Sequence, residues 1–441
     1  MSPYPVANDH PKDLNDCETD AEVDAWWEAQ TRGLQPGVPP KPHASANEWG
    51  VNLDGTIPDA LDRPLSHFVR PFVWRDPATM PRRQWVYGKQ LIRKFVSATF
   101  APGGVGKSAL VLAEAMAMAS GKPVLGIRPV HRLKVGYWNG EDPFEETERR
   151  ALAACLLHDL GPDDLDGWLH LGSGREDAVV IAEQTRDGAT ILAPNVESIL
   201  DTIRSLQLDV VILDPFVSTH QVTENDNNAI DLVAKRWGKI ADETNTAISL
   251  VHHTRKTNGA ETTVEDGRGA VSLLNAARSA RVLNAMSKEE RERAGVKPGE
   301  AYFRVENGKT NLTPPAEGAD WFQVASVDLD NGDTFNPSDN VGAVRRWKWP
   351  DAFDGIKATD LLAVQRAIDG GQWRENAQAN EWAGRAVADT LGLNLDDPAD
   401  KSKVKSLLAT WIKTGALVRV TMKDEGRRDR PMIEVGKWAE I

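Results

Sequence analysis

One segment of the sequence carries the residue types of a phosphate-binding loop. Residues 101–108 read APGGVGKS and lie between an apolar run and an alanine-rich stretch. Glycines in such a loop let backbone N–H groups turn inward around phosphate oxygens, and a following helix adds positive potential. Except for Ala101 at the first position, the segment fits GxxxxGK[ST], in which the lysine meets the β- and γ-phosphates. The pattern predicts that ATP and Mg²⁺ bind at Pro102, Gly103, Gly104, Val105, Gly106, Lys107, Ser108 and Ala109.

Two carboxylates follow apolar runs elsewhere in the chain. The run VVILD ends in Asp214, which we expect to hold Mg²⁺ through water, beside the Ser108 hydroxyl. The run KVGYW is followed by NGED, residues 139–142, whose Glu141 has the chemistry to orient and deprotonate the attacking water. The alternative for NGED is a purely structural role as the start of a helix, with Asp142 as the N-cap. Because Asp142 can take the cap, we assign Glu141 to catalysis.

A pair of adjacent histidines, His252 and His253, closes the apolar run AISLV. Successive side chains of a strand point to opposite faces of a sheet, so at most one of the two faces a nucleotide. This argues against metal binding by both. We expect one imidazole to sense the γ-phosphate or a bound water and the other to pack nearby, with a purely structural pair as the alternative.

The runs that precede these residues alternate with helical patterns, which is typical of a parallel sheet covered by helices. We expect strands at 95–101, 134–139, 209–214 and 247–253. We expect helices at 111–119, 195–206 and 229–243. In open α/β sheets, ligands gather at the carboxyl ends of the strands, where all the residues above lie. The sequence thus predicts an α/β fold with its ATP site at that edge of the sheet.

The patterning changes beyond the predicted core strands. Residues 301–349 read as short strands with turns at Asn307-Gly308 and Asn331-Gly332. From about Ala358 the expected order is three helices and then two strands, which is similar to a winged helix. We therefore divide the chain into an acidic, Pro/Gly-rich extension (1–65), an ATPase core (66–350) and a winged-helix-like domain (351–441).

Five motifs occur together in this chain: APGGVGKS, NGED, ILDP, VHHTRK and DGRGAVSLLNAARSARVL. In this order and spacing they resemble the RepA-like branch of the RecA/DnaB-type ATPases, the hexameric helicases of plasmids and phages. The resemblance covers about residues 70–345. It implies a RecA-like P-loop core, a homo-hexamer with ATP sites between subunits, and ATP-driven translocation on single-stranded DNA.

The resemblance also implies roles for particular side chains. The family's catalytic base falls on Glu141, and its γ-phosphate sensor falls on His252 or His253. An arginine that reaches into the neighbouring subunit's site falls on Arg281, with Arg278 as the second match. A guanidinium inserted in this way neutralises charge that develops on the transferred phosphoryl group. The alternative for both arginines is a surface ion pair.

Three segments are candidates for DNA contact. The resemblance places DNA-binding loops at 217–228 and 255–269, both of which are polar and expected to be mobile. The second loop offers phosphate-binding cations, Arg255, Lys256 and Arg268, although acidic neighbours weaken the case. The chain end is basic, and we expect its wing to contact duplex DNA through Arg427, Arg428 and Arg430.

Charge and composition limit the choice of function. The net charge of −13 argues against indiscriminate coating of nucleic acid. The two cysteines, Cys17 and Cys155, support neither a disulfide framework nor a cysteine metal site. We find no apolar run long enough to cross a bilayer and no secretory signal, so we expect a cytoplasmic protein with no membrane partner.

The sequence therefore predicts an ATPase that acts on DNA as a helicase or a replication-accessory motor. Two alternatives stay open. A DNA-binding switch, such as an initiator or recombination mediator, uses ATP to assemble on DNA without movement, and the winged-helix-like tail favours it. A regulatory ATPase with a protein target is the other, and the overall acidity is its best support.

Overall fold

The structure is a computed structural model. It describes Val69 and residues 72–186, 188–254, 261–264, 266, 270–297, 299–310, 312, 318–423 and 429–440. The expected N-terminal extension therefore lies outside the described residues, and so do five predicted DNA contacts, Arg255, Lys256, Arg268, Arg427 and Arg428. Among the helices that are described, none combines the length and the apolarity that a membrane span requires.

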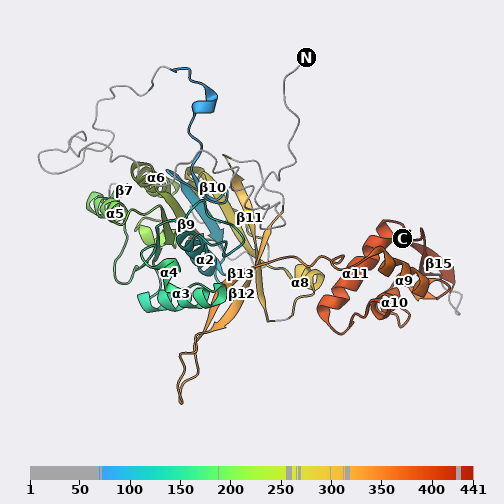
Figure 1. The fold of residues 1–441 in the computed structure, drawn as a ribbon. Helices are drawn as coiled ribbons and strands as arrows, with labels where there is room; N and C mark the ends of the chain where they lie inside the picture. The colour runs from blue at the N-terminus through green and yellow to red at the C-terminus, as the bar shows by residue number, and fades with distance from the viewer. Residues whose placement is uncertain are drawn as a thin grey trace, which may run out of the picture.

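A nine-stranded sheet forms the centre of the larger unit, with the strand order β13-β12-β11-β10-β3-β9-β8-β4-β5 (Figure 1). Its parallel strands are β3 (Val96–Ala101), β4 (Val135–Asn139), β5 (Leu169–Ser173), β8 (Val210–Asp214), β9 (Ala247–His253) and β10 (Ser279–Ala285). Its antiparallel strands are β11 (Ala301–Thr310), β12 (Asp320–Asp328) and β13 (Asn340–Trp347). The α/β fold expected from the sequence is confirmed.

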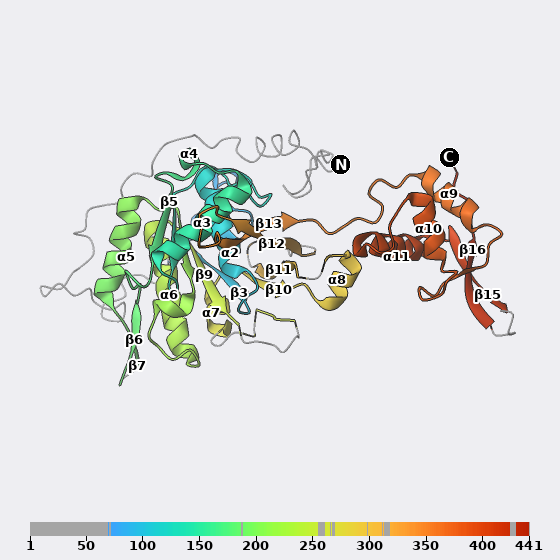
Figure 2. The same cartoon turned by 90° about the horizontal axis from the view of Figure 1, so that it is seen from below.

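Helices cover both faces of the sheet (Figure 2). One face carries α2 (Lys107–Ser120), α3 (Phe144–His158) and α4 (Pro162–Leu165). The other carries α5 (Ala193–Leu206), α6 (Asn227–Thr244) and α7 (Ala270–Ala276). The sequence of β8 is apolar throughout because the strand is covered on both faces. Val211 and Leu213 pack on the face that carries α5, α6 and α7, and Val210 and Ile212 pack on the opposite face.

The predicted turn at Asn307-Gly308 is wrong, because β11 continues through it to Thr310. Asn307 pairs with Arg281 of β10 at a point where the register shifts. A Cβ on Gly308 would lie 2.2 Å from Val264 Cγ1, so this glycine permits a close approach rather than a turn. The second predicted turn, Asn331-Gly332, does lie in the connection between β12 and β13.

Smaller elements complete the described chain. Two-stranded sheets are formed by β1 (Trp85–Tyr87) with β2 (Leu91–Ile92), and by β6 (Ala182–Thr185) with β7 (Gly188–Ile191). Two short 3₁₀ helices occupy Pro77–Thr79 and Phe216–Thr219. The helix α8 (Lys288–Ala294) connects β10 to β11.

The C-terminal unit has its own hydrophobic core. It contains α9 (Ala358–Ile368), α10 (Ala383–Leu391) and α11 (Pro398–Lys413). Its three-stranded sheet has the order β14-β16-β15, from β14 (Trp373–Arg374), β15 (Leu417–Lys423) and β16 (Asp429–Val435). The unit meets the core where the Ser402 hydroxyl of α11 donates to the backbone oxygen of Arg293 in α8.

Candidate active site

The segment APGGVGKS connects the end of β3 to the start of α2 at the carboxyl edge of the sheet. Gly104 and Gly106 have φ angles of 81° and 110°, a region that side chains rarely adopt. A Cβ on Gly106 would also lie 3.0 Å from Val324 Cγ2. At Gly103 and Gly104 no heavy atom lies within 4 Å of an added Cβ, so this side of the loop is open to a ligand.

Lys107 and Asp214 form a buried ion pair in front of the loop. The Lys107 ammonium donates to Asp214 Oδ1 at 3.0 Å and lies 3.4 Å from the Ser108 hydroxyl. The Tyr137 hydroxyl donates to the other carboxylate oxygen of Asp214 at 3.3 Å. Burial, with the nearby Asp214 charge, raises the pKa of Tyr137 well above its ordinary value, which keeps the phenol protonated as a donor. Tyr137 was not among the predicted site residues, because its run reads simply as a strand.

These groups fit the requirements of a nucleotide with Mg²⁺. A flexible ammonium suits phosphate oxygens, while a hydroxyl beside a carboxylate offers the oxygen ligands that Mg²⁺ prefers. Within the described residues, no group of three or more His, Cys, Asp or Glu side chains is arranged to hold a metal ion.

The NGED segment is held next to Asp214 by backbone contacts. The Gly140 N–H donates to the backbone oxygen of Asp214 at 2.8 Å. The Asn139 side-chain oxygen accepts from the Glu141 N–H at 2.9 Å, and Arg175 Nε donates to the Glu141 backbone oxygen at 2.8 Å. The Glu141 carboxylate is left 56% exposed, so its backbone is fixed while its side chain faces solvent.

The predicted N-cap at Asp142 is wrong. The cap position of α3 is Pro143, with no side-chain hydrogen bond. The Asp142 carboxylate instead pairs with Arg150, Oδ2 to NH1, at 2.7 Å. The proline occupies the residue before the helix, so Asp142 lies one position too early to reach the first turn.

The two histidines at the end of β9 lie in different surroundings. His252 is buried against the rings of Phe100 and Phe216, at centroid distances of 5.8 and 6.1 Å. His253 is half-buried, and its Nε2 lies 3.6 Å from Glu141 Oε1. Burial, and after it the Lys107 charge, lowers the pKa of His253, so this imidazole is neutral near pH 7. The alternation of the strand thus brings one histidine to Glu141 and buries the other.

Arg281 does not lie where the sequence interpretation placed it. Its guanidinium is buried inside the subunit and donates to both oxygens of Glu114 in α2, at 2.5 and 2.6 Å. Its Nε also donates to the Thr99 hydroxyl at 3.0 Å. This geometry fits neither an arginine that reaches into a neighbouring subunit nor a surface ion pair, so both interpretations of Arg281 are wrong. No strand was among those expected around Arg281, and its neighbours in the sequence do not reveal the buried acid opposite.

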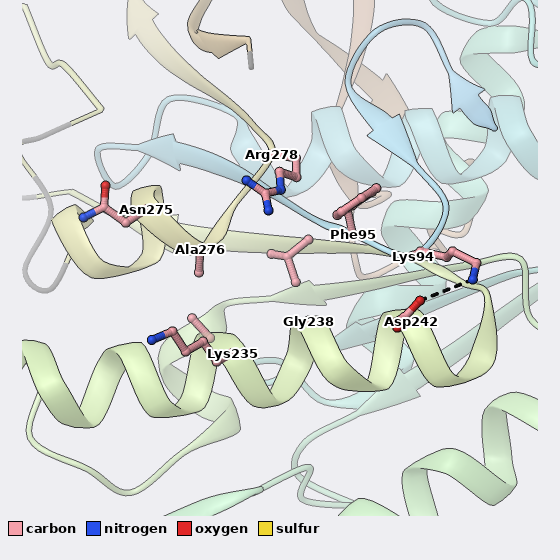
Figure 3. Close-up of a pocket in the computed structure, with 10 residues that line it drawn as sticks. Lys94, Phe95, Lys235, Gly238, Asp242, Asn275, Ala276 and Arg278 are labelled. Atoms are coloured by element: carbon pink, nitrogen blue, oxygen red, sulfur yellow. Dashed lines mark hydrogen bonds and ion pairs between the residues drawn. The ribbon is translucent and has the colours of Figure 1, made fainter. Parts of the chain in front are cut away.

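Arg278 lies at the other edge of the sheet, where β3 and β10 begin. Its guanidinium carbon lies 5.6 Å from the centroid of the Phe95 ring, and the residue is exposed. Figure 3 shows it at a pocket between these strand starts and α6. The structure therefore separates the two predicted arginines, one inside the core and one on the surface.

The expectation of a mobile loop at 217–228 is wrong for its first half. Thr219, His220 and Val222 are buried, and the Thr219 hydroxyl accepts from the Trp237 indole at 3.2 Å. Burial lowers the pKa of His220 to about 4, so it is a neutral part of the core at pH 7. Apolar contacts fix this stretch, and Asp226 then caps α6.

Of the predicted wing residues, Arg430 is described and lies half-buried in β16. Arg427 and Arg428 fall outside the described residues.

Comparison with known protein families gives a match in the part of the chain that carries this site. Residues 63–259 match a family model described as an AAA domain. The match includes the phosphate-binding loop, NGED, the strand ending in Asp214 and both histidines, and it ends before Arg278 and the C-terminal unit. Residues 63–259 are therefore similar to an AAA domain, which supports a P-loop ATPase in this part of the chain.

Proposed function

We propose that this protein is an ATP-hydrolysing, RecA-like motor that acts on DNA as the RepA-like hexameric helicases do. The observation that carries the proposal is the convergence of Lys107, Asp214, Glu141 and His253 at one edge of the sheet, in front of an open glycine loop. The resemblance of the five motifs supports the ring and the DNA substrate.

In this proposal, nucleotide binding replaces the ion pair between Lys107 and Asp214 by two others: Lys107 with phosphate, and Asp214 with a cation. In the structure Lys107 and Asp214 neutralise each other, and both are buried. A triphosphate carries more negative charge than one carboxylate, so it draws the Lys107 ammonium to its β- and γ-oxygens. Asp214 is then free to face a cation beside Ser108. Bound Mg²⁺ neutralises charge on the phosphate oxygens.

Glu141 acts as the base in this proposal, and His253 lies beside it. The Glu141 carboxylate projects from a fixed backbone into solvent, where a water molecule that attacks the γ-phosphate can reach it. The neutral His253 ring can donate or accept a hydrogen bond, which suits a group that reports on the γ-phosphate. The ring of His252 is buried among aromatic side chains and serves the core.

The C-terminal unit gives the proposed motor a second DNA contact. Three helices followed by two long strands have the order of a winged helix, with α11 as its third helix. The exposed faces of α11 and β15 carry Lys401, Lys405, Lys413 and Arg419. Such cations meet phosphates without reading sequence, so this unit fits duplex DNA. A DNA-binding switch is the second candidate, and the same unit favours it.

Replacing Glu141 with Gln is expected to lower kcat by on the order of 10²- to 10⁴-fold, because the amide cannot take a proton. Nucleotide affinity should stay within a few-fold, since the backbone contacts of the residue are kept. Single-turnover hydrolysis and equilibrium binding of a fluorescent nucleotide measure the two quantities. Glu145→Gln, the same change on an 80% exposed side chain in α3, is the matched control. Parallel loss of binding and turnover would show that Glu141 is structural.

Single-stranded DNA is expected to raise the steady-state ATPase rate of the full chain, with a stimulation that weakens as salt increases. The Lys107→Ala variant in the same assay shows that the hydrolysis comes from this site. Displacement of a labelled strand then separates a motor from a switch. An ATPase rate that no DNA changes would reject the DNA substrate and favour a regulatory ATPase with a protein target.

A further inference from the structure

The connection between β12 and β13 is an acidic hairpin that projects from the ATPase core (Figure 1). From Asp328 to Asn340 the sequence holds four aspartates and neither lysine nor arginine. At the tip, Phe335 is 92% exposed, more than any other large apolar side chain of the described residues. The Phe335 ring is therefore available for contact with a partner.

Hydrogen bonds within the tip hold its shape, while Leu329 packs on the core and Asp339 pairs with Arg149 of α3 at 3.5 Å. Asp333 Oδ1 accepts from the N–H groups of Phe335 and Asn336, at 2.7 and 2.8 Å. Asn331 bridges the two sides of the loop through its contacts with Ser338 and Asp339. This network holds Phe335 outward before any partner arrives, which lowers the entropy cost of docking. The hairpin is therefore a pre-organised projection.

The charge of the hairpin limits what it can meet. Aspartates repel phosphates, so this surface does not suit DNA. The described residues contain no metal-binding cluster of acidic side chains, so the aspartates are not assembled for a cation. A cationic protein surface with room for an aromatic ring is the complementary partner.

Such a surface exists on the same chain, in the pocket of about 530 Å³ shown in Figure 3. Its lining includes the cations Lys94, Lys235 and Arg278, the ring of Phe95, and one carboxylate, Asp242. Lys94 is paired with Asp242 at 3.3 Å, whereas Arg278 lies over the Phe95 ring. The Lys235 side chain is 71% exposed and pairs with Asp231 on its own helix. The pocket lining thus has more cationic than anionic side chains, together with the aromatic ring of Phe95.

The hairpin and the pocket belong to opposite edges of the sheet. Both β10 and β12 run antiparallel to β11, so β12 points in the direction of β10 and β3. The hairpin therefore leaves at the carboxyl edge, on the side of the phosphate-binding loop, while the pocket lies where β3 and β10 begin. Two such surfaces pair between copies in a head-to-tail arrangement, which generates a ring when the rotation closes.

We propose that the hairpin tip, residues 329–339, docks into the Arg278 pocket of a second copy of this chain. Phe335 enters beside Phe95, and Asp330 faces Lys235 and Arg278. The inference rests on the ring that the proposed function requires. It gives Arg278 a role in assembly, which differs from the phosphate-contacting role that the motif resemblance implied.

The test is the assembly state of the full chain, measured by analytical ultracentrifugation with a non-hydrolysable ATP analogue. Phe335→Ala is expected to weaken association at least about tenfold, as loss of a buried aromatic anchor does. Asp330→Asn, which removes the charge but tolerates the φ of 53° at this position, should weaken it less. Met422→Ala, which changes an exposed apolar residue on β15, is the control and should leave association unchanged.

Charge reversal makes the pairing specific. Asp330→Lys and Lys235→Glu should each weaken association, and an equal mixture of the two variants should recover part of it through the reversed pair. Unchanged assembly of Phe335→Ala, or a wild-type chain that stays monomeric, would overturn the docking proposal. DNA-stimulated ATPase activity is measured separately, so failure of the hairpin contact is distinguishable from failure of the DNA-motor proposal.

The turnover of Arg278→Ala at low and high protein concentration tests the role of this arginine. If high protein concentration restores a loss of turnover, the role of Arg278 is assembly. A loss that high concentration does not restore would assign Arg278 to the chemistry.

Discussion

Lys107→Ala is expected to lower ATP turnover by on the order of 10²- to 10³-fold or more, because it removes the charge that meets the β- and γ-phosphates. The structure adds a second effect on the protein without nucleotide. Lys107 is the ion-pair partner of Asp214, whose carboxylate is 1% exposed. Removing one partner of a buried pair leaves an uncompensated charge, so we expect the free energy of unfolding to fall by about 3–5 kcal/mol.

The two effects separate in a double variant. In Lys107→Ala with Asp214→Asn the buried charge is gone, so much of the lost stability should return while turnover stays absent. Denaturant unfolding without nucleotide measures the first quantity and phosphate release the second. Full turnover by Lys107→Ala would refute the nucleotide site, and unchanged stability would show that the pair with Asp214 contributes little.

Arg281→Ala is expected to destabilise the protein by about 3–5 kcal/mol, since it leaves Glu114 buried without its partner. The sequence interpretation as a surface pair predicts at most about 1 kcal/mol. The difference arises from burial, because Glu114 and Arg281 side chains are only 6% and 8% exposed. Urea unfolding of the variant measures the change.

Two controls identify the cause. Arg204→Ala, which breaks an exposed ion pair with Asp201 in α5, should change the free energy of unfolding by at most about 1 kcal/mol. Arg281→Leu with Glu114→Gln removes both charges, and it should recover part of the stability. Because the guanidinium acts inside its own subunit, a mixture of Arg281→Ala and Lys107→Ala subunits should show no more turnover than the two variants measured separately. Recovery on mixing would reinstate a finger at Arg281.

Sequence patterns predicted most of the elements that carry the candidate site. The loop APGGVGKS and the runs that end in Asp214 and His253 follow from patterns of neighbouring residues, and parallel strands bring their carboxyl ends to one edge. The expected core strands differ from the observed ones by a residue at most. Two parallel strands, β5 and β10, were not among the expected strands, although six of the seven residues of β10 are buried.

Contacts between distant segments were decided by the tertiary structure. Glu114 and Arg281 are 167 residues apart, so neither neighbourhood shows that the two charges neutralise each other. The hydrogen bond from Tyr137 to Asp214 was likewise not visible in the sequence, and neither was the burial of the stretch that follows Asp214. Gly308 looked like a turn because Asn-Gly favours one locally, yet Val264 occupies the space where a side chain would lie. Local patterns fix which elements form and which chemistry they carry, whereas burial and partners depend on packing between elements that the sequence lists far apart.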